Sequence, residues 1–404
     1  MTEEQKEIRY VCFKTPDKVY GIDICDLVSQ PKEEEAVVNW DSLPPIPAAL
    51  KADLPAFCTQ LVELGSNFCL FGGFCYPQRG GSRCGSPSFK VFELKLIQFQ
   101  LQREDPRKKL TCRESKLIPQ PPQPFGKLLS ECFEIRGDFY FIVFDPMVPA
   151  PSPTFSWVLR SRTRKWESLP TPPCLYIDYE VLQFMRTERY LVVENLSQRK
   201  SCFTLLILSL KWDMDQTRPT FNVQGHRRFY CPVMRLPAPG FRDYSIHLST
   251  SHIEKSDLFG AWDNGYRATL HALLVNERGV RIVQPIENCF DGIQPSFICA
   301  SPVLISLGTN MICAMLFGFT KEHHNCRCPL VCISVFHYSV MEDAIDIDYI
   351  NSSSLPKVQN FLTVNVMNKH VYSMIEYLEN SMTDDDLYPF LDEIKGFTWK
   401  ENKA

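Results

Sequence analysis

Several features that would point to a definite class of protein are missing from this 404-residue sequence. Lys and Arg do not outnumber Asp and Glu (43 against 47), so a general nucleic-acid binder with a broad basic face is not expected. No stretch of about 18 apolar residues occurs, and no transmembrane helix is therefore predicted. Gly is scarce at 18 residues, and helical periodicity is nearly absent before the C-terminus.

Motifs of catalysis are also missing. The sequence contains no Gly-x-Ser-x-Gly, His-Glu-x-x-His or Gly-x-Gly-x-x-Gly motif in a suitable context, and the Gly-rich segment 80–85 lacks the Lys-Ser/Thr ending of a phosphate-binding loop. The 8 His residues are scattered along the chain. We therefore predict no catalytic residues, no cofactor and no bound metal.

The N-terminus has the charged sequence Met-Thr-Glu-Glu-Gln-Lys-Glu, which has no apolar core and does not resemble a secretory signal. A reducing compartment, cytoplasmic or nuclear, is the expectation, with no membrane association. The 17 Cys residues are then mostly free thiols, and several lie within apolar runs where Cys serves as a small core residue.

Short strand-like runs dominate the sequence. Phe (28) and Tyr (15) are plentiful and favour strands, while the 30 Pro residues favour rigid turns and strand ends. The runs fall into sets of about four, the number of strands in one blade of a β-propeller. The clearest set comprises residues 128–135, 139–144, 154–160 and 165–169.

The other sets predict a single all-β propeller over residues 8–370. They comprise 57–64, 68–71, 89–100 and 113–118; 180–185, 190–194, 202–210 and 221–234; 244–248, 258–262, 268–275 and 280–285; and 295–306, 311–319, 330–338 and 344–350. The N-terminal set (8–13, 19–27, 36–43) lacks one strand. Pairing it with 361–367 near the C-terminus would close the ring and remove two exposed edges.

This grouping predicts six four-stranded blades, or seven if 371–379 begins another element. Residues 1–7 are predicted to be disordered. Residues 371–404 are predicted to be a tail that contains acidic Asp384-Asp385-Asp386 and several aromatic residues. This tail is either a short helix, a partner-binding segment or a frayed end with one packed turn.

One motif occurs twice, far apart in the chain. Trp40-Asp41-Ser42-Leu43-Pro44-Pro45-Ile46-Pro47 and Trp166-Glu167-Ser168-Leu169-Pro170-Thr171-Pro172-Pro173 place Trp, Leu and two Pro residues at equal offsets. Recurrence at this distance favours a repeat architecture. The motif has no group suited to catalysis, so its members Trp40, Leu43, Pro44, Trp166, Leu169 and Pro170 are interpreted as structural residues.

Together with 68–73, which ends in Gly72-Gly73, and the aromatic run 89–94, these motifs resemble the kelch repeat. The resemblance is degenerate, as in plant kelch and F-box-associated propellers, and no F-box precedes the first strand. It implies that Gly72 and Gly73 form a tight turn, and that the Trp side chains are wedges between blades. It further implies a non-catalytic protein-interaction module, a substrate-recognition or adaptor subunit, whose loops bind protein partners but not nucleic acid.

Three other readings remain open. Cys326 and Cys328, with His323 and His324 nearby, have a spacing unlike that of zinc sites and are interpreted as part of a hairpin loop, with a metal or redox site as the alternative. Two basic clusters, in 103–116 and 160–165, are interpreted as solvated hairpin connections. The alternative function is a propeller enzyme or carbohydrate-binding protein of the galactose-oxidase-like class, with its site in a central channel.

Overall fold

The structure of the protein is a computed structural model. The residues it describes are 6–15, 18–28, 43–57, 59–64, 67–75, 90–99, 107–116, 118–122, 129–135, 137–144, 154–169, 182–186, 190–195, 200–206, 211–213, 229–236, 244–252, 269–276, 279–293, 297–308, 310–320, 329–341, 360–374 and 394–402. Nearly all of these lie in strands, and the one α-helix among them is α1 (Ile24–Val28). None of the described helices is long and apolar enough to cross a membrane.

The chain forms two compact units. Unit 1 comprises Met1–Thr15, Tyr20–Ala49 and Pro219–Ala404, and unit 2 comprises Pro16–Val19 and Leu50–Arg218. Both are built from antiparallel sheets of four strands, joined largely in the order of the chain.

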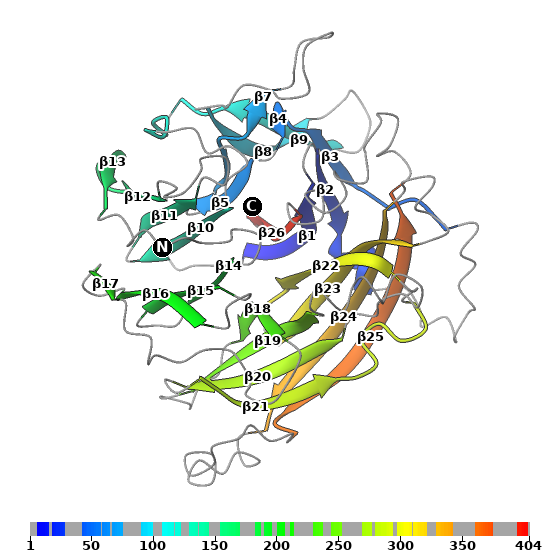
Figure 1. Cartoon of the computed structure of the whole chain (residues 1–404). Helices are drawn as coiled ribbons and strands as arrows, with labels where there is room; N and C mark the ends of the chain where they lie inside the picture. Colours follow the sequence, from blue (N-terminus) through cyan, green and yellow to red (C-terminus); the bar gives the residue numbers. More distant parts are fainter. Residues whose placement is uncertain are drawn as a thin grey trace. The chain divides into compact units, whose positions relative to one another are not determined.

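Unit 2 contains three such sheets, drawn from cyan-blue to green in Figure 1. Their strands are β5 (Gln60–Leu64), β6 (Asn67–Phe71), β8 (Val91–Phe99) and β9 (Arg107–Glu114); β10 (Leu129–Ile135), β11 (Asp138–Phe144), β12 (Thr154–Arg160) and β13 (Lys165–Ser168); and β14 (Leu182–Arg186), β15 (Tyr190–Asn195), β16 (Lys200–Leu206) and β17 (Lys211–Asp213). The short strands β3 (Leu50–Asp53), β4 (Ala56–Phe57) and β7 (Phe74–Cys75) also lie in this unit, and β4 pairs with β7.

Unit 1 contains two four-stranded sheets in which neighbouring strands follow one another in the order of the chain. Their strands are β18 (Phe229–Leu236), β19 (Tyr244–His252), β20 (Leu270–Asn276) and β21 (Gly279–Ile286); and β22 (Phe297–Ser306), β23 (Met311–Thr320), β24 (Leu330–Val340) and β25 (Leu362–Ser373). The predicted all-β class is confirmed, and this succession of antiparallel four-stranded sheets has the topology of a β-propeller. Five blades of strands in chain order are described, so the predicted number of six or seven is not confirmed.

The two ends of the chain share a further sheet, in which β26 (Lys395–Asn402), β1 (Lys6–Lys14) and β2 (Lys18–Asp23) follow one another. Antiparallel pairing joins Lys6 to Asn402 and Lys14 to Lys395. The sequence prediction that the N- and C-terminal strands pair is confirmed, but the predicted partner was wrong. Of residues 361–367, all but Phe361 belong to β25, which pairs with β24 along its whole length.

Other boundaries also differ from the predicted ones. The run 221–234 was expected to be a fourth strand, but β17 takes that place and β18 begins the next sheet. β1 begins at Lys6, inside the segment expected to be disordered, and the C-terminal segment 395–402 is a strand rather than a helix. The runs 258–262 and 344–350, and the acidic residues Asp384–386, lie outside the described residues.

In unit 1, β23 and β24 are buried on both faces of their sheet. Along β23, Ile312, Ala314 and Leu316 enter one core, which is shared with Leu274 and other residues of β18–β21. The alternate residues of β23 enter a second core, shared with the terminal sheet through Val11, Phe13, Tyr20 and Ile22. Because side chains alternate across a strand, a strand between two sheets must be apolar at nearly every position.

A residue in the middle of β25 binds the backbone of α1. Asn368 donates from Nδ2 to the carbonyl oxygens of Leu27 and Val28, at 3.0 and 2.8 Å. These carbonyls belong to the last turn of α1, where a helix leaves acceptors without internal partners. Within the core between β18–β21 and β22–β25, Gln284 accepts from the amides of Phe361 and Leu362, both at 2.8 Å, and thereby fixes the start of β25.

Gly396 allows β26 to pack closely on β22. A Cβ atom at this position would lie 2.4 Å from Val303 Cγ1 and 2.6 Å from Ile305 Cδ1. Both contacts are far inside van der Waals distance, so a side chain at 396 would force β26 away from the core.

We predict that Gly396→Val lowers the free energy of unfolding by about 1–3 kcal/mol, the usual cost of overpacking a core. The measurement is urea denaturation followed by tryptophan fluorescence. Lys395→Val is the matched control, since Lys395 is exposed on the same strand. Equal stability of Gly396→Val and the parent chain would contradict the close packing of β26.

Candidate functional site

Trp166 joins two neighbouring sheets of unit 2. Its ring packs against Phe141 in its own sheet, with centroids 5.1 Å apart, and edge-on against Phe71 of the β5–β9 sheet at 6.0 Å. Its Nε1 donates to the carbonyl of Pro119, 3.0 Å away, in the segment that leads from β9 toward β10. A half-buried Trp thus supplies apolar contact to both sheets and satisfies one backbone acceptor between them.

The same connecting segment is held at its other end by Glu93. The Glu93 carboxylate accepts from Ser115 Oγ and forms an ion pair with Lys95 Nζ at 2.9 Å, while Ser115 Oγ accepts from the amide of Ile118. Burial acts to raise the pKa of Glu93, but the bonds from Ser115 and Lys95 outweigh it, so its pKa lies below the ordinary value.

The other residues of the predicted structural motif lie in three places. Leu43 and Pro44 pass the end of β25, where their carbonyls accept from Ser373, the Pro44 oxygen from its amide at 2.9 Å. Gly72 and Gly73 have φ of 66° and 81°, the left-handed conformation that Gly adopts without strain. Leu169 follows β13 and is half-buried, and Trp40 and Pro170 lie outside the described residues, as do Cys326 and Cys328.

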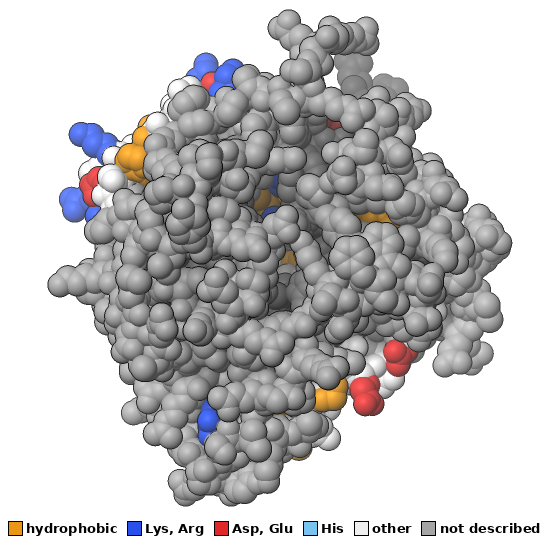
Figure 2. Space-filling model, viewed as in Figure 1, with side chains coloured by type: hydrophobic (Ala, Val, Ile, Leu, Met, Phe, Trp, Pro, Cys, Tyr) orange, Lys and Arg blue, Asp and Glu red, His pale blue; other side chains and the backbone are white. Residues whose placement is uncertain are grey.

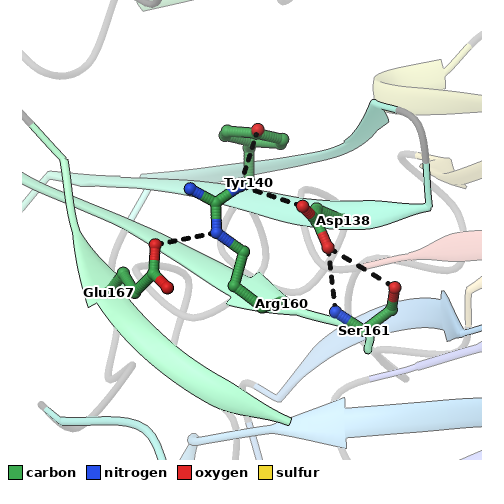
Figure 3. Close-up of polar contacts among 5 residues, drawn as sticks. All are labelled: Asp138, Tyr140, Arg160, Ser161 and Glu167. Atoms are coloured by element: carbon green, nitrogen blue, oxygen red, sulfur yellow. Dashed lines mark hydrogen bonds and ion pairs between the residues drawn. The ribbon is translucent and has the colours of Figure 1, made fainter. Parts of the chain in front are cut away.

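Arg160 is the centre of a polar network on the β10–β13 sheet (Figure 3). Its guanidinium donates from Nη1 to Asp138 at 2.9 Å and from Nε to Glu167 at 2.8 Å, while the Tyr140 hydroxyl lies 3.5 Å from Nη1. Asp138 also accepts from the backbone amide of Ser161 at 2.9 Å. The network therefore connects β11, β12, β13 and the turn between the last two.

The Asp138 carboxylate is stabilised in its charged form by this network. Partial burial acts to raise its pKa, but the hydrogen bonds from Arg160 and from the Ser161 backbone outweigh that effect, and the pKa lies below the ordinary value. The hydrogen bonds to Asp138 and Glu167 likewise raise the pKa of Arg160. Arg160 is thus fully charged and engaged by two carboxylates.

The turn after Arg160 presents further cations to solvent. Arg162, Arg164 and Lys165 are all exposed. Arg164 has a φ of 53°, and its amide donates to the Arg160 carbonyl at 2.7 Å, which closes the turn. Figure 2 shows Lys and Arg side chains, with acidic ones beside them, at the edge where Figure 1 places β13.

Unit 2 exposes basic residues on the adjoining sheet as well. Lys109 and Arg113 on β9, and Lys116 just beyond it, are exposed, and so is Lys95 on β8. Arg164 lies near enough to Glu93 on β8 to help lower the pKa of that carboxyl. The two basic clusters found in the sequence therefore occur on adjacent sheets of one unit. We call Arg162, Arg164, Lys165 and Lys95 the basic edge.

A second polar cluster, in unit 1, was missed in the sequence. Ser245 and His247 lie two residues apart on β19, so their side chains share a face, and Ser245 Oγ is 2.9 Å from His247 Nε2. Burial, with the positive charge of Arg235 on the paired strand β18, lowers the pKa of His247 to about 4. Ser249 and His271, paired across β19 and β20, are buried on the same face.

The alternation Ser-Ile-His-Leu-Ser in 245–249 is the signal that could have revealed this cluster, since it places polar residues on one face of a strand and apolar ones on the other. His247 is neutral at pH 7 and close to a hydroxyl, an arrangement that allows proton exchange between them. Among the described residues, no three His, Cys, Asp or Glu side chains gather in a way that could hold a metal ion.

Comparison with known proteins identifies no family. No family model matches the chain, and no curated protein matches it. Among solved structures, it is similar to an ulvan lyase described as a new family of polysaccharide lyase, with 10% sequence identity, 82% of each chain covered and a TM-score of 0.34.

Two substitutions at Trp166 should separate packing from hydrogen bonding. We expect Trp166→Ala to cost about 3–5 kcal/mol of unfolding free energy, the usual range for emptying an aromatic site. Trp166→Phe keeps much of the ring contact but removes the hydrogen bond to the Pro119 carbonyl. Loss of that bond should lower the unfolding free energy by about 1 kcal/mol, in addition to any loss of packing. Thermal and urea melts measure both; an unchanged Trp166→Ala melt would mean that Trp166 does not join the sheets.

His247 should make stability depend on pH in a defined window. Its folded pKa of about 4 lies below its ordinary value of 6.5, so the unfolded chain takes up a proton more readily. Stability is therefore full above pH 6.5 and falls by roughly 3 kcal/mol as the pH drops toward 4. Urea titrations at pH 7.5, 6 and 5 should show this fall in the parent chain. His247→Gln should lose stability at pH 7.5 but show a flatter dependence, and an equal slope in both chains would refute the assignment.

Proposed function

We propose that this chain is a non-catalytic protein-interaction module built on a closed, kelch-like β-propeller. Three observations support the kelch-like reading: β1 pairs with β26, Gly72 and Gly73 form a left-handed turn, and Trp166 contacts two sheets. In this proposal the terminal sheet closes the ring, because pairing of the two chain ends removes the exposed edges that an open series of blades would leave.

The observation that carries the interaction function is the basic edge. The chain as a whole has a formal charge of −4, yet the hairpin from β12 to β13 concentrates cations on an exposed turn. Charged groups at a protein surface steer and select partners more than they stabilise the fold, and isolated exposed ion pairs contribute only about 0–1 kcal/mol. A rigid, exposed and locally basic turn is suited to binding an acidic protein surface.

The proposed role is that of an adaptor or substrate-recognition subunit in the cytoplasm or nucleus. The cysteines support a reducing compartment: those described as free thiols include Cys12, Cys69, Cys313 and Cys332, all of them buried. Burial raises the pKa of the Cys313 thiol, so it is kept as an inert core group.

The test is capture of partners by the full-length chain from cells that express it, followed by reconstitution with each purified candidate. We expect at least one captured protein to form a stoichiometric complex, measured by size-exclusion chromatography with light scattering and by calorimetry. If no captured protein forms such a complex, the interaction function is wrong.

A second candidate function is catalysis or carbohydrate binding by the cluster around Ser245 and His247. A neutral His beside a hydroxyl is a starting point for acid–base chemistry, and buried neighbours such as Ser249 and His271 add polar atoms to the same face. This candidate shares with the galactose-oxidase-like alternative only the general class of function, which is that of an enzyme or a carbohydrate-binding protein. Among the described residues, no group of His, Cys, Asp or Glu side chains could hold a metal ion.

The two candidates predict opposite outcomes for one pair of variants. If the chain is an interaction module, Ser245→Ala should leave partner binding unchanged, and no turnover of a panel of neutral and anionic polysaccharides should be seen by reducing-end or ultraviolet assays. If the second candidate is right, the parent chain should turn over one of these substrates, and Ser245→Ala should reduce the rate at least tenfold. The substitution Ser251→Ala, on the same strand, is the control.

A further inference from the structure

We propose that one face of β8 and β9 binds a phosphorylated serine or threonine of the partner protein, through Lys95, Lys109 and Arg113. This inference rests on the proposed interaction function and names the chemistry of the partner. It depends on three properties of these cations: their place on one face of a rigid sheet, their pairing within the sheet and their exposure.

The three cations lie on the same face of the sheet. Residues 109, 111 and 113 alternate along β9, so Lys109 and Arg113 flank Thr111 with their Cα atoms about 14 Å apart. Lys95 on β8 is paired with Thr111, so its side chain lies on this face as well. Thr111 is short, and its hydroxyl donates to the Lys95 carbonyl at 3.2 Å. Three long cationic side chains therefore surround one short side chain.

The same face continues inward into the core of unit 2. Cys69 on β6 and Val91 on β8 belong to one core with Phe141 of the β10–β13 sheet. The register places Glu93 opposite Cys69 on one side and opposite Arg113 on the other. The face thus changes from apolar at its inner strands to basic at β9. Packing of the apolar part fixes the strands that present the cations, and a surface fixed in advance loses little freedom on binding.

The positive charge of this face is not balanced within the sheet. Glu93 lies opposite Arg113, but its carboxylate is bound by Lys95 Nζ at 2.9 Å and by Ser115 Oγ. In the part of the chain that the structure describes, Lys109 and Arg113 form no ion pair. Lys95 is diagonal to both of them across β8 and β9, and like charges at such short range repel. A bound anion would relieve this repulsion.

All three cations are accessible to a partner. Lys109 and Arg113 are exposed, and the Lys95 side chain is 53% exposed although it pairs with Glu93. An exposed ion pair contributes only about 0–1 kcal/mol, so the pair with Glu93 does not prevent Lys95 from turning toward a second anion.

A phosphate monoester matches this arrangement better than a carboxylate does. It carries about 1.5–2 negative charges at pH 7 and three strong acceptor oxygens. The planar guanidinium of Arg113 can bind two of these oxygens at once, while Lys95 and Lys109 act as point charges. A carboxylate has one charge and two oxygens, and therefore satisfies fewer of the three cations.

A phosphorylated protein segment also fits this face better than a nucleic acid. Proteins that hold single-stranded nucleic acid combine a long basic groove with exposed aromatic platforms. Among the described residues, the large hydrophobic side chain that is exposed is Met341, which lies in unit 1. A compact group of three cations suits a single dianion.

The test measures fluorescence anisotropy of a fluorescein-labelled nine-residue peptide of Gly, Ala and Ser, with one central phosphoserine, against the full chain at low salt. We expect it to bind at least tenfold more tightly than the same peptide with unmodified Ser, and at least threefold more tightly than the peptide with Glu. Lowering the pH from 7.5 to 5.5 should weaken the phosphopeptide, because its phosphate takes up a proton near pH 6, and leave the Glu peptide unchanged.

Two outcomes of this measurement contradict the assignment. Equal binding of the unmodified peptide would show that the phosphate is not recognised. Tighter binding of a 20-nucleotide single-stranded DNA than of the phosphopeptide would assign the face to nucleic acid instead.

The location is tested with Lys109→Gln/Arg113→Gln. The matched control is Arg162→Gln/Lys165→Gln, which removes the same charge from exposed positions on the neighbouring sheet. We expect the first variant to weaken phosphopeptide binding at least tenfold with an unchanged melting temperature, and the control to weaken it less than threefold. Equal effects of the two variants would overturn the location.

The captured partner separates failure of this inference from failure of the interaction function. Phosphatase treatment of the partner, and Lys109→Gln/Arg113→Gln in this chain, should each abolish the stoichiometric complex. If the complex survives both, the phosphate site is wrong and the interaction function stands. If the parent chain forms a complex with no captured protein, the interaction function itself is wrong.

Discussion

Burial of both faces of a four-stranded sheet is the constraint on which the rest of this structure depends. Strand β23 shows it most clearly, because its successive side chains enter two different cores. A sheet that is apolar on both faces is stable only when another layer covers each face, and in a chain whose described residues lie nearly all in strands those layers are sheets. The repeated sheets of each unit are therefore a consequence of composition: so many Val, Ile, Leu and Phe residues in short strands can be covered only by stacking.

Stacking of sheets creates a second requirement, which is to join them without leaving polar backbone buried and unpaired. Unit 2 meets it with side chains: Trp166 donates to Pro119, and Ser115, held by Glu93, accepts from Ile118. Unit 1 meets it with Gln284 and Asn368, which bind backbone groups at the start of β25 and at the end of α1. Polar residues with fixed positions thus determine where one sheet stops and the next begins.

The same constraint decides where function can lie. Inner strands are occupied by packing, so exposed and chemically varied side chains collect on outer strands such as β9 and β13. Phe141 on β11 is buried, whereas Lys165 on β13, two strands away in the same sheet, is exposed. Side-chain exposure therefore rises sharply from the inner to the outer strand of one sheet. Buried polar groups such as His247 are exceptions, and desolvation keeps that imidazole neutral.

The sequence by itself determined the strands that are apolar and bounded by strong turn residues. The set 128–135, 139–144, 154–160 and 165–169 matches β10 to β13 within a residue or two, because Arg136-Gly137-Asp138 and the basic turn interrupt it clearly. Only the tertiary structure decided which strands share a sheet: 362–367 lies in the strand that completes β22–β24, and 395–402 pairs with β1. It also decided that Ser245 lies beside His247 and that Arg160 binds both Asp138 and Glu167. Local propensity depends on a residue and its near neighbours, whereas pairing depends on contacts between residues far apart in the chain, and several apolar strands of similar length can compete for the same neighbour.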